Sequence, residues 1–282
     1  MNNLKELMNK AWQIRKDNFP ASIYFAYPNN TTPITLTGKS CDLDCAHCGG
    51  HYLEHMVDMN EAEVILKKRE SSSCLISGGC DHKGAVPLVE QIKFLEKLKD
   101  NNYRLNSHLG LASQEEIDEV TKHVDVVSFD FVSNQETIQE VYNLPHTAQD
   151  YIDCYQALRE KTTVFPHICI GLKGGEIKGE YQTLEILEKI GAAALVFIVF
   201  IPTKGTTYQD RQPPALEEVG KVLATARIKF PKIPIYLGCM RPKGRYRGEL
   251  DLLAVKCGVN KIVIPSPPAV KYVEDLGWEV IK

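Results

Sequence analysis

The sequence lacks the features typical of membrane-spanning, disordered or nucleic-acid-binding chains. It has no run of about 18 consecutive apolar residues, so no transmembrane helix is predicted. The N-terminal segment MNNLKELMNKAWQIRKDNF has neither an apolar core nor a small-residue cleavage site, so we expect no secretory signal and a cytoplasmic location. The net charge of −3 argues against a strongly basic face for nucleic acid. With 44% apolar residues, the chain is too hydrophobic to be disordered.

Cysteine is abundant by contrast. The 282 residues include nine cysteines, an odd number that does not suggest a disulfide framework in a chain without an export signal. Reduced cysteines leave metal ligation, catalysis or inert burial as their roles. Cys41, Cys45 and Cys48 lie close together with the spacing Cys-x3-Cys-x2-Cys. Tight loops of thiolates bind iron–sulfur clusters or zinc.

Short β-rich runs alternate with amphipathic segments along most of the chain. This pattern predicts an α/β protein with parallel strands, most simply a (β/α)8 barrel of the TIM type, with an open doubly wound sheet as the alternative. We expect residues 1–30 to form an N-terminal extension, with a helix at 4–15 and a short strand at 23–27, and residues 31–282 to form a single barrel domain. The predicted barrel strands are 34–37, 74–77, 104–107, 124–129, 167–172, 194–201, 233–238 and 261–264. The predicted helices between them include 85–99, 180–190, 216–228 and 247–256.

The cysteine triplet directly follows the first predicted barrel strand. Together with His47, which precedes the last cysteine, it resembles the signature of the radical S-adenosylmethionine (SAM) superfamily. The resemblance implies that Cys41, Cys45 and Cys48 ligate a 4Fe–4S cluster and that SAM chelates the fourth iron. One electron then cleaves SAM to methionine and a 5′-deoxyadenosyl radical. His47 would pack beside the adenine.

The resemblance extends to the ends of two further strands. Gly78, Gly79 and Cys80 follow the second strand, where many members of the superfamily have Gly-Gly-Glu with glycine backbone near the SAM amino group. Cys80 replaces that glutamate. Asp130, or failing that Ser128, ends the fourth strand, where the biotin synthase branch has a polar residue that reaches the SAM ribose.

Later strands carry further matching segments. The segment from Gly171 to Glu176 looks like the glycine-rich, Glu-ending segment beside the adenine. Pro202 begins a Pro-x-x-Gly-Thr turn common in biotin synthase-like enzymes. His108 follows the third strand and is a candidate substrate contact. Arg241 lies in a basic cluster after the seventh strand, which is either a solvated loop, a carboxylate anchor or a dock for an acidic carrier protein.

Three more cysteines lie at strand ends or within strands. Biotin synthase and lipoyl synthase carry a second Fe–S cluster that serves as the sulfur source. Cys80, Cys169 and Cys239 could therefore hold an auxiliary cluster, with inert burial as the alternative.

Several segments look most like the two-component lipoyl synthases of archaea and anaerobes, including Leu-Gly-Cys-Met-Arg-Pro and Pro-His-Ile-x-Ile-Gly-Leu. This resemblance implies sulfur insertion into an octanoyl chain on an acceptor protein. It also implies a paralogous radical SAM partner and an electron donor such as ferredoxin or flavodoxin. The alternatives are a radical SAM enzyme of cofactor biosynthesis or rearrangement without sulfur insertion, and a non-enzymatic Fe–S or zinc protein.

Overall fold

The structure is a computed structural model that describes residues 3–282, and the chain forms two compact units. Unit 1 contains the N-terminal segment up to Pro28 together with His167–Pro202 and Asp210–Lys282, and unit 2 contains Asn29–Pro166 and Thr203–Gln209. Each unit combines helices with parallel strands. The predicted α/β class with parallel strands is therefore confirmed.

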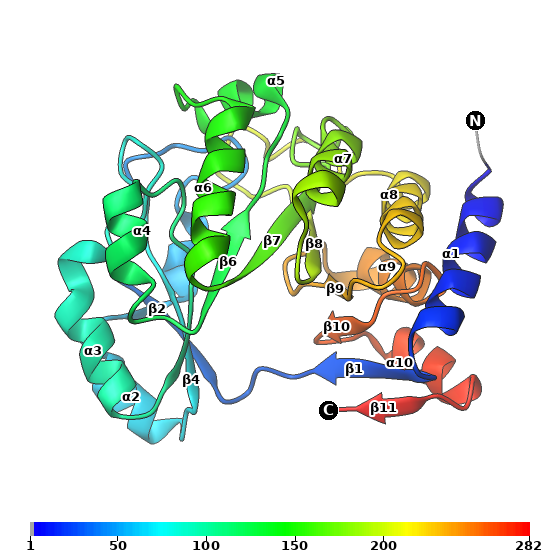
Figure 1. The fold of residues 1–282 in the computed structure, drawn as a ribbon, viewed down its shortest axis with the longest axis horizontal. Helices are drawn as coiled ribbons and strands as arrows, with labels where there is room; N and C mark the ends of the chain where they lie inside the picture. Colours follow the sequence, from blue (N-terminus) through cyan, green and yellow to red (C-terminus); the bar gives the residue numbers. More distant parts are fainter. Residues whose placement is uncertain (1–2) are drawn as a thin grey trace. The chain divides into compact units, whose positions relative to one another are not determined.

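Unit 2 contains a sheet with the strand order β6-β5-β4-β2-β3 and parallel pairing throughout. Helices α4 and α6 lie side by side along it (Figure 1). The strands are β2 (Thr31–Thr35), β3 (Val57–Asp58), β4 (Ser73–Ser77), β5 (Arg104–Ser107) and β6 (Val126–Asp130). The helices are α2 (Ala62–Lys68), α3 (Ile92–Asp100), α4 (Gln114–Val120), α5 (Gln135–Thr137) and α6 (Ala148–Lys161), with short 3-10 or π turns η1 (His51–His55), η2 (Val89–Gln91) and η3 (Ile138–Tyr142).

Unit 1 contains strands in the order β11-β1-β10-β9-β8-β7. The chain passes from unit 2 to unit 1 within β7. The strands are β1 (Ser22–Ala26), β7 (Thr163–Ile170), β8 (Leu195–Val199), β9 (Ile235–Leu237), β10 (Lys261–Val263) and β11 (Glu279–Ile281). The helices are α1 (Leu4–Asn18), α7 (Glu180–Ile190), α8 (Leu216–Lys229), α9 (Gly244–Lys256) and α10 (Pro267–Asp275).

The N-terminal segment is an integral part of unit 1. Strand β1 lies between β10 and β11 and pairs in parallel with both (Figure 1). Ile23 and Phe25 on β1 are each only 1% exposed, and α1 packs against α8. The predicted helix and short strand are both present, but the strand joins the sheet.

All eight predicted barrel strands are found, with ends that differ by a few residues. Strands β3 and β11 were not predicted; β3 has two residues, which are too few to show a periodicity. The helix predicted at 85–99 begins later, at Ile92. Ala85 instead forms a bridge with Gly110, and Pro87 disfavours helix at the residue before it.

The strands of unit 2 bring the predicted site residues to one edge of its sheet. Because β2, β4, β5 and β6 are parallel, their carboxyl ends share that edge. Fully buried residues such as Ile34, Ile76 and Val127 fix the strands to the core. Among residues 3–282, no helix is both long and apolar enough to cross a membrane.

Candidate functional site

The cysteine loop leaves the carboxyl end of β2. Cys41, Cys45 and Cys48 are free thiols, each partly exposed. The backbone N–H groups of Cys48 and Gly49 both donate to the Cys45 carbonyl, at 2.9 and 3.0 Å. This tight turn keeps Cys45 and Cys48 close together on one short loop.

Thr37 and Gly79 anchor the start of this loop to the end of β4. The Thr37 hydroxyl donates to the Ser40 carbonyl at 2.8 Å and accepts from the Gly79 N–H at 2.7 Å. A Cβ on Gly79 would stand 2.5 Å from Cys41 Cα, which is too close for any side chain. Glycine at position 79 therefore allows the cysteine loop to pack on the strand end.

Cys80 lies beside the first cysteine of the loop. Its carbonyl accepts from the Asp42 N–H at 2.9 Å and from the Cys41 thiol at 3.8 Å. Burial raises the pKa of the Cys80 thiol to about 12, and the charges of Cys41 and Asp130 add to this effect. The structure thus brings Cys80 into the neighbourhood of the cysteine loop.

The loop thiols disfavour one another's ionisation. Burial is the main cause that raises the pKa of Cys45, and Cys48, Cys80 and Cys41 raise it further. Burial also raises the pKa of Cys48, with a contribution from Cys41. A coordinated metal reverses this preference, because a metal-bound thiol loses its proton. The raised pKa values of Cys45 and Cys48 therefore fit thiols that ionise when a cationic iron–sulfur core binds them.

Among residues 3–282, no three His, Cys, Asp or Glu side chains are arranged to hold a single metal ion. The thiolates of a four-iron cluster each bind a different iron. They need not converge on one point, so the loop remains compatible with a cluster.

His47 presents a neutral aromatic ring in the middle of the loop. The ring meets that of Tyr142 edge to face, with centroids 5.7 Å apart. Burial lowers the pKa of His47 to about 4, although the carboxylate of Asp130 opposes the shift. Its Nδ1 is buried and has no hydrogen-bond partner within the described residues.

Three further predicted residues lie at or near the carboxyl ends of β5 and β6. Asp130 is exposed, and its charge acts on both His47 and Cys80. Ser128 is 3% exposed, and its hydroxyl donates to Asn106 Oδ1 at 3.0 Å, so that donor is used within the fold. His108 is partly buried, with its backbone N–H bonded to the Ile76 carbonyl of β4. Asp130 is thus the more available of the two ribose candidates.

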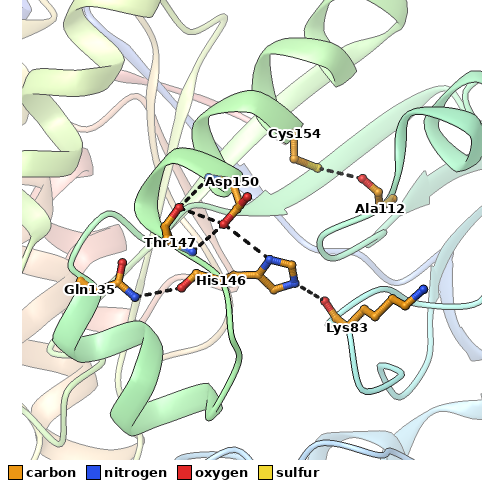
Figure 2. Close-up of polar contacts among 7 residues, drawn as sticks. All are labelled: Lys83, Ala112, Gln135, His146, Thr147, Asp150 and Cys154. Atoms are coloured by element: carbon orange, nitrogen blue, oxygen red, sulfur yellow. Dashed lines mark hydrogen bonds and ion pairs between the residues drawn. The ribbon is translucent and has the colours of Figure 1, made fainter.

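The segment that follows Cys80 is fastened to the start of α6. Figure 2 shows the His146 ring between the Lys83 carbonyl, 2.8 Å from Nε2, and Asp150, 3.6 Å from Nδ1. Since a carbonyl only accepts, Nε2 carries the proton. Asp150 also accepts from the N–H and hydroxyl of Thr147, which caps α6. These contacts fix the course of the chain beyond Cys80.

The predicted residues after β7 form a glycine-rich turn in unit 1. Gly171 has φ +75°, and its N–H donates to Glu180 Oε1 at 2.7 Å. Burial raises the pKa of Glu180, whose Oε2 is buried without a partner in the described part of the chain. Glu176 forms an isolated antiparallel β-bridge with Lys173. Pro202 is the last residue of the segment His167–Pro202 of unit 1. The resemblance to the superfamily implied that Glu176 ends the segment beside the adenine. The buried carboxylate under this turn, however, belongs to Glu180.

The other predicted residues of unit 1 differ in their surroundings. Cys169 is partly buried on β7, in register with Ile198 of β8, and Cys239 is exposed beyond β9. Arg241 was a candidate for a carboxylate anchor or a dock, with a solvated loop as the alternative, but it is a buried structural residue. Its guanidinium is only 1% exposed, binds both oxygens of Asp251 at 2.7 and 3.0 Å, and also donates to the carbonyls of Gly238 and Ile264. No accessible donor is left for a ligand.

Two residues that shape the site were not singled out from the sequence. Thr37 links Ser40 to Gly79, and Tyr142 supports the ring of His47. Neither belongs to a motif with a chemical rationale, and both act through partners distant in sequence. Thr37 lies in the Leu-Thr-Gly segment before Cys41, which resembles the lipoyl synthases, but that resemblance gives it no role of its own.

The comparisons with known proteins agree with this geometry. No family model matches the chain. Biotin synthase from Legionella pneumophila (strain Corby) is 23% identical over 263 residues, covering 87% of this chain and 79% of the relative. Methylornithine synthase has a TM-score of 0.72 at 13% identity, covering 99% of this chain and 89% of that structure. The FeFe-hydrogenase maturase HydG from Carboxydothermus hydrogenoformans also has a TM-score of 0.72, at 15% identity, covering 98% of this chain and 72% of that structure.

The relatives and folds together support the radical SAM superfamily for this chain. The structural likenesses, at 13% and 15% identity, show a shared α/β fold. None of these comparisons distinguishes a lipoyl synthase branch.

Proposed function

We propose that this chain is a radical SAM enzyme in which Cys41, Cys45 and Cys48 hold a 4Fe–4S cluster. The observation that carries the proposal is the loop of three free thiols at the carboxyl end of β2, anchored by the Thr37–Gly79 contact. When bound, the cluster supplies the electron that cleaves SAM. The α/β fold with parallel strands and the biotin synthase relatives support the same class of reaction.

The residues around the loop have distinct roles in this proposal. His47 offers a neutral ring beside the adenine, and the backbone at Gly78 and Gly79 receives the SAM amino group. Asp130 accepts from the ribose hydroxyls, with Ser128 as the alternative. In unit 1 the proposed SAM contacts are Gly171, Glu176 and Pro202. His108 is proposed to contact the substrate.

For the substrate, we propose sulfur insertion into an octanoyl chain carried by an acceptor protein. The support is the amino-acid sequence of the cysteine loop and of the segments around Cys169 and Cys239, together with the biotin synthase relatives. Cys80, Cys169 and Cys239 would hold the auxiliary cluster that provides sulfur. A paralogous radical SAM chain and a ferredoxin or flavodoxin would be the protein partners.

The first test is reductive SAM cleavage by anaerobically reconstituted protein with dithionite. One electron and one SAM should give one methionine and a 5′-deoxyadenosyl radical, which becomes 5′-deoxyadenosine after taking a hydrogen atom. Cys45→Ala should abolish both products, because two thiolates cannot retain the cluster. Cys257→Ala is the matched control, since that thiol is 1% exposed at the end of α9. Cleavage at the wild-type rate in Cys45→Ala contradicts the proposal.

A second test separates sulfur insertion from the other radical reactions. Two clusters per chain correspond to about eight irons and one cluster to about four. The triple variant Cys80/Cys169/Cys239→Ala should lose one cluster, still cleave SAM, and form no carbon–sulfur bond. Mössbauer spectra with a single cluster in the wild type would leave the SAM chemistry intact and favour a rearrangement or cofactor-maturation reaction.

A further inference from the structure

A pocket in unit 1 lies where α9 begins. It has a volume of about 530 Å³. One wall is the first turns of α9, with Gly244, Arg245 and Arg247, and the other is the segment that follows β10, with Ile264 and Ser266. None of these residues has a role in the proposed SAM chemistry.

The start of α9 has unused hydrogen-bond donors. Lys243 stands at the cap position and makes no side-chain cap contact. Within residues 3–282, no group accepts from the backbone N–H of Gly244 or Arg245. Free N–H groups and the helix dipole together favour a negatively charged group at such an end.

The charged side chains that line the pocket also favour a negatively charged ligand. Arg245 and Arg247 line it, against a single acid, Glu249. Arg245 pairs with Glu249 at 2.5 Å, but its side chain is 92% exposed and can turn toward a ligand. Arg247 donates to the Ile264 carbonyl at 2.7 Å through one of its nitrogens, which leaves other donors of its guanidinium available.

Ser266 gives an independent sign of a ligand. It lines the pocket, is only 8% exposed, and its hydroxyl oxygen has no hydrogen-bond partner in the described residues. It occupies the cap position of α10 yet its side chain makes no cap contact, because Pro268 has no N–H to donate and the N–H of Ala269 donates to the Ser266 carbonyl instead. Buried hydroxyls are nearly always bonded, so a missing partner points to a group that the pocket receives.

The rest of the lining is apolar. Leu252, Ile264 and three prolines from Pro265 to Pro268 form most of it. Ile264 is 44% exposed and has φ +50°, a conformation that is unfavourable for a β-branched residue. The N–H of Ile264 bonds to Ala26, and Arg241 and Arg247 both bond its carbonyl, so the fold holds this side chain at the pocket wall.

We propose that this pocket binds an amphiphilic oxyanion, a carboxylate or phosphate carried on an aliphatic chain. The oxyanion lies at the start of α9 between Arg245, Arg247 and the hydroxyl of Ser266. The chain lies against Leu252, Ile264 and the prolines. Carboxylate and phosphate share the chemistry that this end of α9 recognises.

The test measures binding of hexanoate and hexyl phosphate to the full-length reconstituted protein by ligand-observed NMR. Hexanol keeps the chain without the charge, and acetate and inorganic phosphate keep the charge without the chain. Hexanoate or hexyl phosphate should bind about tenfold more tightly than hexanol. The same anion should also bind about tenfold more tightly than its short counterpart, acetate or inorganic phosphate. The tighter of the two anions identifies the head group. Equal affinity for hexanol and the anions, or no binding by any probe, overturns the proposal.

Variants locate the binding at this pocket. Arg245→Gln should weaken binding of the tighter anion about three- to tenfold and leave hexanol binding unchanged. Ser266→Ala should also weaken binding of that anion. Arg245 is exposed, so its replacement leaves folding intact. Lys271→Gln, an exposed cation on α10 paired with Asp275, is the control and should change nothing. Unchanged anion affinity in Arg245→Gln contradicts the proposal, and SAM cleavage is not part of the readout.

Discussion

Gly79 lies so close to Cys41 that the backbone of Cys41 leaves no room for a side chain at position 79. A Cβ at position 79 would stand 2.5 Å from Cys41 Cα and closer still to the Ser40 carbonyl. The end of β4 and the cysteine loop thus form one packed unit, and the position of the first proposed iron ligand depends on a residue that carries no side chain.

Gly79→Ala should therefore displace the cysteine loop. We expect the unfolding free energy to fall by about 1–3 kcal/mol, as for an overpacked site, and most of the bound iron and sulfide to be lost. Gly248→Ala is the control, because its nearest neighbour is the Pro268 side chain at 3.7 Å. Iron and sulfide per chain, with denaturant unfolding, give the measurement. A fully loaded Gly79→Ala protein would show that the loop does not need this contact.

Asp130→Ala should weaken SAM binding and leave the cluster in place. A carboxylate that accepts from ribose hydroxyls contributes about 1.5–3 kcal/mol, so calorimetry should show a loss of that size. Iron content should not change, because Asp130 affects the cysteines only by the electrostatic effect of its charge. Asp153→Ala, on the surface of α6, is the control. Unchanged SAM affinity in Asp130→Ala would assign the ribose contact to another residue.

Glu180 makes the stability of unit 1 depend on pH. Burial raises its pKa in the folded state above that of the unfolded chain, so the folded protein prefers the protonated carboxyl. The associated stabilisation is complete below the unfolded pKa and is lost as the pH rises through the folded pKa.

Glu180→Gln removes this titration and keeps an oxygen for the Gly171 N–H. The unfolding free energy of the wild type, relative to the Gln variant, should fall as the pH rises from the unfolded-state pKa, about 4.3, through the raised folded-state pKa. Glu180→Ala should be about 1–3 kcal/mol less stable than Glu180→Gln at every pH, because it leaves the Gly171 donor unpaired and neither variant titrates at this position. A wild-type advantage that grows with pH would mean that the ionised carboxylate has a favourable partner.

Arg241 and Asp251 should behave as a buried structural pair. Both side chains are fully buried, so Arg241→Ala leaves an uncompensated charge and should cost about 3–5 kcal/mol. Arg245→Ala, which breaks the exposed pair with Glu249, should cost less than about 1 kcal/mol. Urea unfolding of the two variants measures the contrast. Equal small losses would show that Arg241 is less tightly integrated than its contacts indicate.

Local patterns were sufficient to predict the eight barrel strands, several of the helices and the proposed cluster loop. Each barrel strand has its own apolar run between turn residues, and the triplet Cys41, Cys45 and Cys48 needs only spacing to be recognised. Helix α7 was predicted at its observed bounds from its apolar spacing alone. These features depend on residues close in sequence, so the sequence by itself determines them.

Contacts between distant segments decided the rest. The sequence shows a short strand near residue 23, but only pairing with β10 and β11 makes it part of the sheet. It shows a basic residue at 241, but Asp251 on α9 and the carbonyls of Gly238 and Ile264 turn that residue inward. It shows a glycine at 79, but the need for it comes from a loop 38 residues earlier. Burial and long-range hydrogen bonds set these roles, and neither is encoded in the spacing of neighbouring residues.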